Sequence, residues 1–344
     1  MSLPRRVAIF LICCSSTALP VFAAPRHITV EVVVTGKAGK PVADLEQADF
    51  ALLDNKKPQK LDYFQPVKGT AAGPGETITV ETIILVDRVN VTFEVANDER
   101  TRLLKYLRDN NGKLAHPTSM IFFNETGVKM QNATQDGNVL ATVLEQSDNS
   151  LRTSRRSQGI QGSAEQAQLS LSALNSIAAV EAKKPGRKML IWLSAGWPAI
   201  SGPQFIPGPA DHKRFFDSIV DTSAAMLKAH ITLYSIDPVG MEAALQFKAG
   251  YYEPFMKPVT AAGKAQADNL ALQVLVNQTG GRILTASNDI GAQIEDCLSD
   301  ESAYYILSFT APEAEGPNEY HGLEVKMGKP GLKARTLTGY YAQP

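Results

Sequence analysis

The chain has 344 residues, which is enough for about two domains. Its hydrophobic fraction of 44% and charged fraction of 20% are those of an ordinary globular protein, and a formal net charge of -1 provides no basic field for nucleic acid. We therefore expect no DNA or RNA partner.

The chain begins with the pattern of an export signal. Arg5 and Arg6 form a positive start, the stretch from Val7 to Ala18 is mostly apolar but short for a membrane span, and small residues follow near Ala23. We predict a signal peptide over residues 1–24 and a secreted or periplasmic mature protein, which would meet the membrane only through this segment before cleavage. The alternative is an uncleaved membrane anchor.

The cysteines predict no internal disulfide in the mature protein. Cys13 and Cys14 lie inside the expected signal, so Cys297 would remain alone. A single cysteine cannot close an internal disulfide, and the mature protein must then rely on its hydrophobic core for stability.

Both ends of the mature chain have the pattern of β-structure. Residues 25–68 contain three segments with strand character, residues 301–344 contain three more, and a linker rich in glycine and proline lies at 70–75. Three strands make an incomplete sheet, so we expect the two ends to pack together as one small β domain. Its core is expected to contain Val32, Phe50, Tyr305 and Phe309.

The central segment, residues 76–300, alternates strands and helices. Its first strand, Ile78 to Val86, is a nearly continuous apolar run, which is typical of a strand buried on both faces in a parallel sheet. Later strands are expected at residues 118–123, 128–131, 188–194, 231–236 and 282–284, and helices at 97–109, 136–146, 163–182, 211–229, 265–278 and 289–298. This alternation predicts an α/β fold with a doubly wound, mostly parallel sheet.

Polar residues follow the first central strand directly. Asp87, Asn90 and Thr92 come after Val86, at the strand's carboxyl end, where open α/β sheets bind their ligands. An aspartate that ends a strand is also a common turn former or helix cap. We take these three residues as candidates for a ligand-binding face, with a structural turn as the alternative.

A loop rich in proline and glycine, residues 196–209, follows the strand that ends at Ser194. Right-handed connections should bring this loop to the edge where Asp87 lies. Further candidates for the ligand face are therefore Ser194, Trp197 and Phe205. Large apolar side chains are costly to leave in water unless they pack locally or meet a partner. The alternative is that the loop merely covers the edge of the sheet.

Several short motifs stand in a fixed order along nearly the whole mature chain. They are Ala48-Asp49-Phe50, Asp54-Asn55-Lys56-Lys57-Pro58-Gln59, Leu85-Val86-Asp87-Arg88-Val89-Asn90, Leu103-Leu104-Lys105-Tyr106-Leu107, Pro185-Gly186-Arg187-Lys188, Trp192-Leu193-Ser194-Ala195-Gly196-Trp197-Pro198, Gln278-Thr279-Gly280-Gly281-Arg282, Tyr304-Tyr305-Ile306-Leu307-Ser308-Phe309 and Gly339-Tyr340-Tyr341. Through this ordered set of motifs, the chain resembles the bacterial secreted family related to the von Willebrand factor type A domain. The resemblance implies a doubly wound α/β domain used for ligand and protein binding, and it implies no known enzymatic activity.

The resemblance also bears on metal binding. Type A domains commonly hold a divalent ion at a metal-ion-dependent adhesion site, where an acid at the end of the first strand is followed by hydroxyls two and four residues on. Here the acid is Asp87, but Val89 and Val91 stand at those positions and have no oxygen to offer. Ser163 offers a hydroxyl at an expected helix start, where Ser163-Ala164-Glu165-Gln166 has the form of a capping box. We predict a degenerate site without a cofactor, in which Asp87 is the candidate ligand should a divalent cation bind.

Two functions are compatible with the sequence. Ser194-Ala195-Gly196 partly matches a nucleophile elbow, but Trp192 occupies the position of the first glycine, and the five histidines have no metal-ligand spacing. Our first hypothesis is an exported, non-enzymatic binding or adhesion-type module that recognises a protein or cell-envelope ligand through loops at the carboxyl edge of the sheet. The alternative is an exported hydrolase with an unrecognised active site. The sequence predicts no particular oligomeric state.

Overall fold

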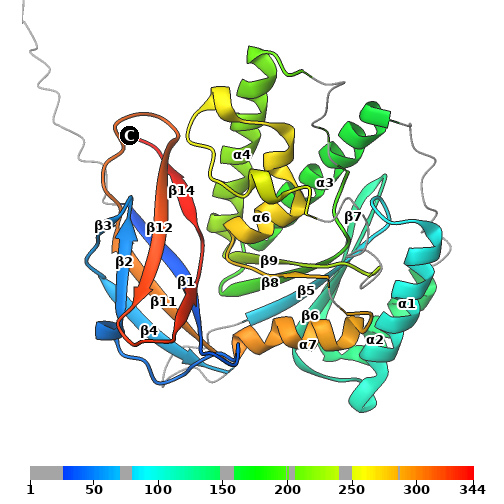
Figure 1. The fold of residues 1–344 in the computed structure, drawn as a ribbon. Helices are drawn as coiled ribbons and strands as arrows, with labels where there is room; N and C mark the ends of the chain where they lie inside the picture. The colour runs from blue at the N-terminus through cyan, green and yellow to red at the C-terminus, as the bar shows by residue number, and fades with distance from the viewer. Residues whose placement is uncertain are drawn as a thin grey trace, which may run out of the picture.

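The computed structural model describes residues 26–69, 80–147, 159–198, 200, 206–239, 250–285 and 287–344. The expected signal segment, the expected linker at 70–75 and the candidate Phe205 lie outside these residues. Figure 1 shows a larger unit of helices and strands beside a smaller unit of strands, and the smaller unit contains segments from both ends of the chain. No helix in the described part of the chain is long and apolar enough to cross a membrane.

A six-stranded sheet forms the centre of the larger unit. Its strands are β5 (Val80–Asp87), β6 (Lys113–Asn124), β7 (Gly127–Asp136), β8 (Arg187–Leu193), β9 (Ile231–Ile236) and β10 (Ile283–Leu284). They lie in the order β10-β9-β8-β5-β6-β7, and within this described sheet only β7 runs antiparallel to its neighbour. The expected mixed α/β class with a mostly parallel sheet is therefore confirmed. The strand order reverses between β5 and β8, which places the switch point of the sheet beside the end of β5.

The sequence of β5 explains its place in the middle of this sheet. Successive side chains of a strand point to opposite faces. Ile83 and Leu85 therefore enter one core, Ile84 and Val86 enter the other, and all four are fully buried. A run of apolar residues without polar alternation suits a strand that is covered on both faces.

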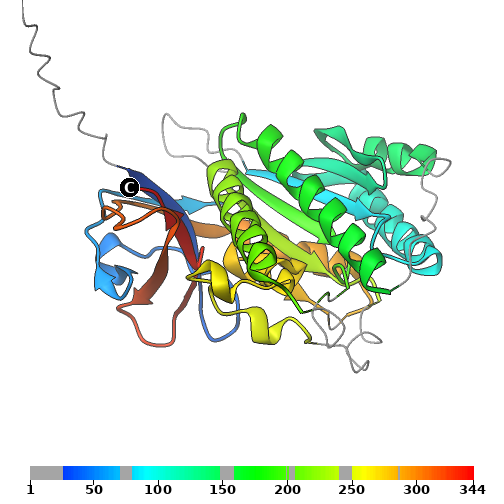
Figure 2. The same ribbon diagram turned by 90° about the horizontal axis from the view of Figure 1, so that it is seen from above.

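Among the described residues, six helices cover the two faces of the main sheet. They are α1 (Phe93–Arg108), α2 (Gly137–Gln146), α3 (Gly159–Glu181), α4 (Pro209–Ala229), α6 (Leu272–Gln278) and α7 (Ile290–Leu298). Apolar residues of α1, α2 and α7 share a core with one face of the sheet, and those of α3, α4 and α6 share a core with the other. Figure 2 shows α3 and α4 lying side by side across the sheet.

Three elements differ from the expected ones. The helix α3 begins at Gly159, so Ser163 lies inside it and the expected capping box is wrong, because nothing between Gly159 and Ser163 stops the helix. The expected helix at 265–278 is divided into a 3-10 turn, η6 (Ala267–Leu270), and α6. There the Asn269 side chain accepts a hydrogen bond from the Gln266 N–H at 2.8 Å and so competes with helical pairing. Strand β7 is longer than its apolar residues indicate, because pairing with β6 extends it.

The smaller unit consists of two antiparallel sheets. Its strands are β1 (His27–Thr35), β2 (Phe50–Asp54), β3 (Lys57–Pro58), β4 (Tyr63–Lys68), β11 (Ala303–Thr310), β12 (Glu319–Met327), β13 (Lys333–Arg335) and β14 (Gly339–Ala342). One sheet has the order β13-β1-β11-β4 and the other has the order β14-β12-β2-β3. Each sheet pairs a strand from the start of the chain with one from the end, β1 with β11 and β2 with β12.

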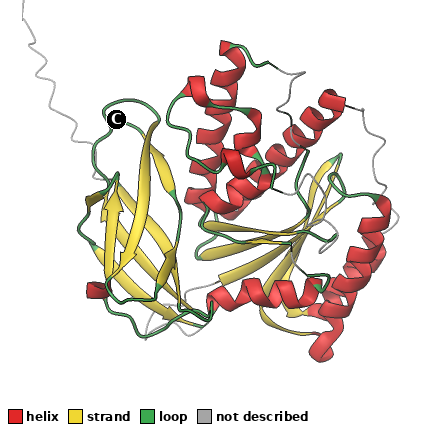
Figure 3. Ribbon diagram, in the orientation of Figure 1, coloured by secondary structure: helices red, strands yellow, loops and turns green. Residues whose placement is uncertain are grey.

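A third hydrophobic core belongs to this smaller unit. Val32, Phe50, Tyr305 and Phe309 are all buried in it, as the sequence predicts. The rings of Phe50 and Tyr305 lie 4.8 Å apart, and the Tyr305 hydroxyl donates a hydrogen bond to the Val42 carbonyl at 2.8 Å. Figure 3 shows mainly strands and loops in this unit, and the short 3-10 helix η1 (Gln47–Asp49) is drawn in red.

Candidate functional site

Asp87 ends β5 at the carboxyl edge of the main sheet, beside the switch point. Its side chain is buried, with 0% of the residue exposed. One carboxylate oxygen accepts hydrogen bonds from the backbone N–H groups of Val89 (2.7 Å) and Asn90 (2.9 Å). The other accepts from Asn90 Nδ2 (2.7 Å) and Trp192 Nε1 (2.8 Å). Four N–H donors therefore surround the carboxylate and hold the turn that follows β5.

Helix α3 fixes this turn from the other side. Asn90 Nδ2 donates to the Ser170 hydroxyl at 2.9 Å, and Gln166 Nε2 donates to the Val89 carbonyl at 3.1 Å. Residues four apart share one face of a helix, and Ser163 lies one turn before Gln166 on that face. The structure thus brings Asp87 and Asn90 together as expected, and it adds Ser170 and Gln166. Gln166 and Ser170 are four residues apart within the predicted helix, and this spacing is the feature of the sequence that could have identified them.

A buried ion pair lies next to this turn. Arg88 and Glu99 are 3% and 0% exposed, and Arg88 Nη1 lies 3.5 Å from Glu99 Oε1. Burial raises the pKa of Glu99 to about 8; the Arg88 charge opposes this shift and the Asp87 charge adds to it. Glu99 is therefore easier to protonate than an exposed glutamate, and Arg88 Nη1 donates a hydrogen bond to it.

The residues present do not fit the divalent ion that the family resemblance implies. Val89 and Val91 are 2% and 6% exposed and pack as apolar side chains, and the Asp87 oxygens already accept four hydrogen bonds. Thr92 uses its hydroxyl to cap α1, accepting from Val95 N at 3.4 Å. Within the described ranges, no group of three or more His, Cys, Asp or Glu residues could hold a metal ion.

The loop after β8 turns inward. The Ser194 hydroxyl is buried and accepts a hydrogen bond from Gly196 N at 3.0 Å, so it is not presented to a substrate or a ligand. Gly196 has a φ of +85°, a conformation that suits glycine and turns the chain back onto the edge of the sheet. Trp197 is 3% exposed, its ring lies 5.8 Å from that of Trp192, and its carbonyl accepts from the Tyr251 hydroxyl at 2.7 Å. Trp197 therefore packs locally, in agreement with the alternative in which the loop covers the edge of the sheet.

Two other apolar side chains are exposed at the carboxyl edge. Phe93 is the first residue of α1 and is 60% exposed, and Ile206, three residues before α4, is 88% exposed. Helix α1 follows β5 and α4 follows β8, so both helices begin at this edge. Because α1 and α4 cover opposite faces of the sheet, the two side chains flank the edge from both sides.

Ionisable groups gather at the opposite, amino edge, where the smaller unit contacts the sheet. Asp300 is 2% exposed and accepts a hydrogen bond from the Tyr234 hydroxyl at 2.7 Å and another from Arg335. The Arg187 guanidinium, at the start of β8, lies 4.6 Å from the centre of the Tyr304 ring. Burial and the charge of Asp300 raise the pKa of Tyr234 above its usual range, so this phenol stays neutral and donates. These contacts join the two units.

Comparison with known proteins identifies no family. No family model matches the chain, and no curated protein matches it. Among solved structures, the chain is similar to the pilus adhesin SpaC from Lactobacillus rhamnosus GG (TM-score 0.35, 10% identity, 91% of this chain and 49% of that chain). It is also similar to the human COPII-coat protein Sec24c (TM-score 0.33, 9% identity, 77% and 44%) and to the type V pili tip protein Mfa5 from Porphyromonas gingivalis (TM-score 0.23, 13% identity, 51% and 27%). The chain spans less than half the length of each of these three chains. Similarity at this level carries no inference about function.

Proposed function

We propose that the chain is an exported binding or adhesion-type module, related to the von Willebrand factor type A domain, that recognises a protein or envelope ligand through the carboxyl edge of its main sheet. The observation that carries the proposal is the exposure of Phe93 (60%) and Ile206 (88%) on either side of this edge. Large apolar side chains at the site where doubly wound sheets bind their ligands favour contact with a partner.

The rigidity of the intervening turn supports this proposal. Asp87 accepts four hydrogen bonds, and α3 holds Asn90 and the Val89 carbonyl, so the backbone before Phe93 is ordered by contacts within the chain. A surface that is ordered in advance loses little conformational entropy on binding. The turn therefore acts as a scaffold for the ligand face, and the ligand meets the side chains around it.

The experiment compares capture of envelope proteins by variants of the purified mature chain. The double variant Phe93→Ser with Ile206→Ser should retain less than about a tenth of the capture of the wild type, because two buried apolar contacts of an interface are lost. Its melting temperature should stay unchanged, since both side chains are exposed in the free protein.

The matched control places the same substitutions at the opposite edge. Val139, near the start of α2, and Val180, near the end of α3, are 44% and 40% exposed. The double variant Val139→Ser with Val180→Ser should capture the same proteins as the wild type. Equal loss in both double variants, or loss in neither, would refute a binding face at the carboxyl edge.

A further inference from the structure

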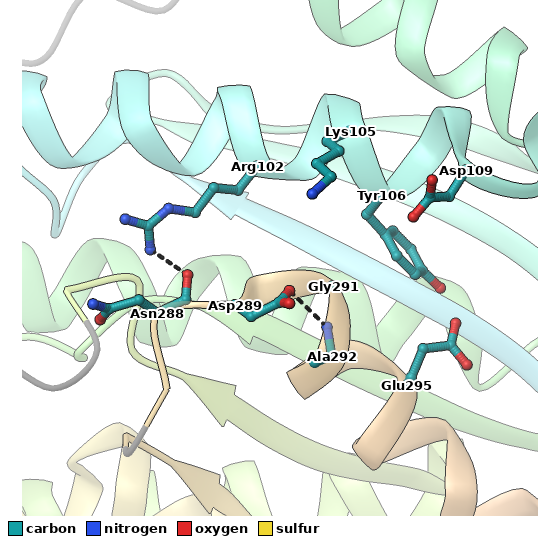
Figure 4. A pocket seen from close by; sticks show the side chains of 9 residues that line it. All are labelled: Arg102, Lys105, Tyr106, Asp109, Asn288, Asp289, Gly291, Ala292 and Glu295. Atoms are coloured by element: carbon teal, nitrogen blue, oxygen red, sulfur yellow. Dashed lines mark hydrogen bonds between the residues drawn. The ribbon is translucent and has the colours of Figure 1, made fainter.

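The turn between α1 and β6 holds two asparagines in an unfavourable conformation. This turn is the 3-10 element η2 (Asp109–Gly112), in which Asn110, Asn111 and Gly112 have φ angles of +50°, +57° and +78°. The left-handed region suits glycine and is costly for residues with a side chain, although asparagine tolerates it better than most. Figure 4 shows Asp109, where the turn begins, among the residues that line the groove between α1 and α7. The turn lies at the amino edge of the sheet, away from the proposed ligand face.

Asn111 and Gly112 form the only Asn-Gly step in the sequence. Asn111 is exposed, and among the described residues no hydrogen bond holds its side-chain amide. Gly112 has no Cβ that would shield its backbone nitrogen from the preceding side chain. A nucleophilic nitrogen and a free carboxamide therefore follow each other in the chain with little steric protection.

From this arrangement we infer that Asn111 is a site of spontaneous deamidation. The Gly112 nitrogen forms a bond to Asn111 Cγ, the Cγ–Nδ2 bond breaks, and Nδ2 leaves as ammonia with the proton of the Gly112 N–H. The product is a five-membered succinimide ring. Water then adds to one of its two carbonyl groups and opens the ring, which leaves aspartate or isoaspartate at position 111. No atom is oxidised or reduced, and water is the only co-reactant.

The folded turn restrains this reaction. In the left-handed conformation the carbonyl oxygen of a residue lies beside its own Cβ, so at a ψ of 28° the Gly112 nitrogen lies on the far side of Asn111. The backbone must rotate before the ring can close. A contact from α2 opposes that rotation, since Asn138 Nδ2 donates to the Asn111 carbonyl at 3.0 Å. The rate of deamidation is thus set by how often the turn opens.

A second step of similar chemistry lies beside the turn. Asp136-Gly137 is the one Asp-Gly step in the sequence, and loss of water there would give the same kind of ring. The Asp136 carboxylate is held, however, because it caps α2 and accepts a hydrogen bond from Asn138 N at 2.9 Å. We expect no isoaspartate at Asp136, so the two steps form an internal comparison.

The test incubates the purified chain for several weeks at neutral pH and physiological temperature, and then maps its peptides by mass spectrometry. Asn111 should gain the mass that marks replacement of an amide by a carboxylate, with isoaspartate among the products, and it should do so more slowly than in a free peptide of residues 106–116. Unmodified Asn111 after that peptide has fully converted would overturn the inference. Equal conversion at Asn124, which is followed by Glu125, would overturn it as well.

Variants test the role of the contact from α2. Asn138→Ala removes the side-chain donor and keeps the backbone N–H that caps α2, so deamidation at Asn111 should rise about fivefold, the factor expected for the loss of one net hydrogen bond. Asn97→Ala is the matched control, because Asn97 is exposed near the opposite end of α1, and it should leave the rate unchanged. Asn111→Gln should abolish the product, since its longer side chain would have to close a six-membered ring. An unchanged rate in Asn138→Ala, or an equal rise in the control, would contradict the inference.

Discussion

The two edges of the main sheet differ in the kind of interaction that orders them. At the carboxyl edge, the Asp87 carboxylate is surrounded by neutral N–H donors, and large apolar side chains are exposed beside it. At the amino edge, the buried Asp300 carboxylate accepts hydrogen bonds from Tyr234 of the main sheet and from Arg335 of the smaller unit. Neutral donors to a single carboxylate order the free edge, whereas a carboxylate with an arginine partner orders the covered edge.

This difference assigns ligand binding to the carboxyl edge and a structural role to the amino edge. Clusters of ionisable groups with shifted pKa values often mark functional sites, but structural networks produce them as well. Here the densest cluster, around Asp300, is covered by β11 and β13 and joins the two units. The proposed ligand face instead lies where few charges are present and apolar side chains remain in water.

The largest effect is expected from a variant that removes the Asp300 carboxylate, at the centre of the junction between the two units. Asp300→Ala should lower the free energy of unfolding by about 4 kcal/mol, because it leaves the guanidinium of Arg335 and the hydroxyl of Tyr234 without their buried acceptor. Denaturant unfolding measures this loss. Asp296→Ala is the control: Asp296 pairs with Arg282 at 3.1 Å but is 55% exposed, so its loss should cost under about 1 kcal/mol. Similar losses in the two variants would mean that the junction is not a buried charge network.

A second test uses the protonation of Glu99 at the carboxyl edge. The folded pKa of about 8 lies above the ordinary value of 4.5, so the contribution of Glu99 to stability is fully present below pH 4.5 and is lost as the pH rises toward 8. Between pH 5 and pH 7, wild-type stability should fall relative to Glu99→Gln by roughly 2 to 3 kcal/mol, since a shift of one pKa unit corresponds to about 1.4 kcal/mol. Parallel pH profiles for the two proteins would show that Glu99 is ionised beside Arg88.

Much of the fold could be predicted because it depends on local patterns. The apolar run of β5 predicted a strand buried on both faces, and the alternation after it predicted the parallel sheet. The strand segments at the two ends of the chain predicted pairing, and β1 pairs with β11. These patterns involve residues that are close together in the sequence, so they can be recognised without knowing the fold.

The candidate site was harder to predict because its contacts are made across the fold. The sequence left open whether Trp197 packs locally or faces a ligand, since nothing in the local sequence shows that Gly196 turns the loop onto Trp192. The donor from Trp192 to Asp87 joins residues 105 apart in sequence, and the contact of Asn90 with Ser170 spans 80. The predicted helix start at Ser163 was wrong for a different reason. The local sequence there has a capping pattern, but the helix already begins at Gly159.

The smallest test examines one ion pair at the junction by its pH dependence. The hydrogen bond to Glu31, at 2.9 Å, and the Glu31 charge raise the pKa of His230 above its ordinary 6.5, although burial opposes this. Burial alone would raise the pKa of Glu31, but the contact with His230 and the charge of Arg187 lower it below 4.5. The contribution of His230 is fully present below pH 6.5 and is lost as the pH rises through its folded pKa, whereas that of Glu31 is present above pH 4.5 and is lost in stronger acid.

The pair should therefore stabilise the protein most between about pH 4.5 and pH 6.5. His230→Gln should lower the free energy of unfolding by under about 1 kcal/mol at pH 5.5, because the His230 side chain is 39% exposed and solvent screens the pair, and by close to nothing at pH 9. Glu31→Gln should show the same pH dependence, and the double variant should lose no more than the larger single loss, since both changes remove one interaction. Additive losses, or a loss that grows toward pH 9, would show that the junction at this point is held by packing, and the contrast between the two edges would then rest on Asp300 alone.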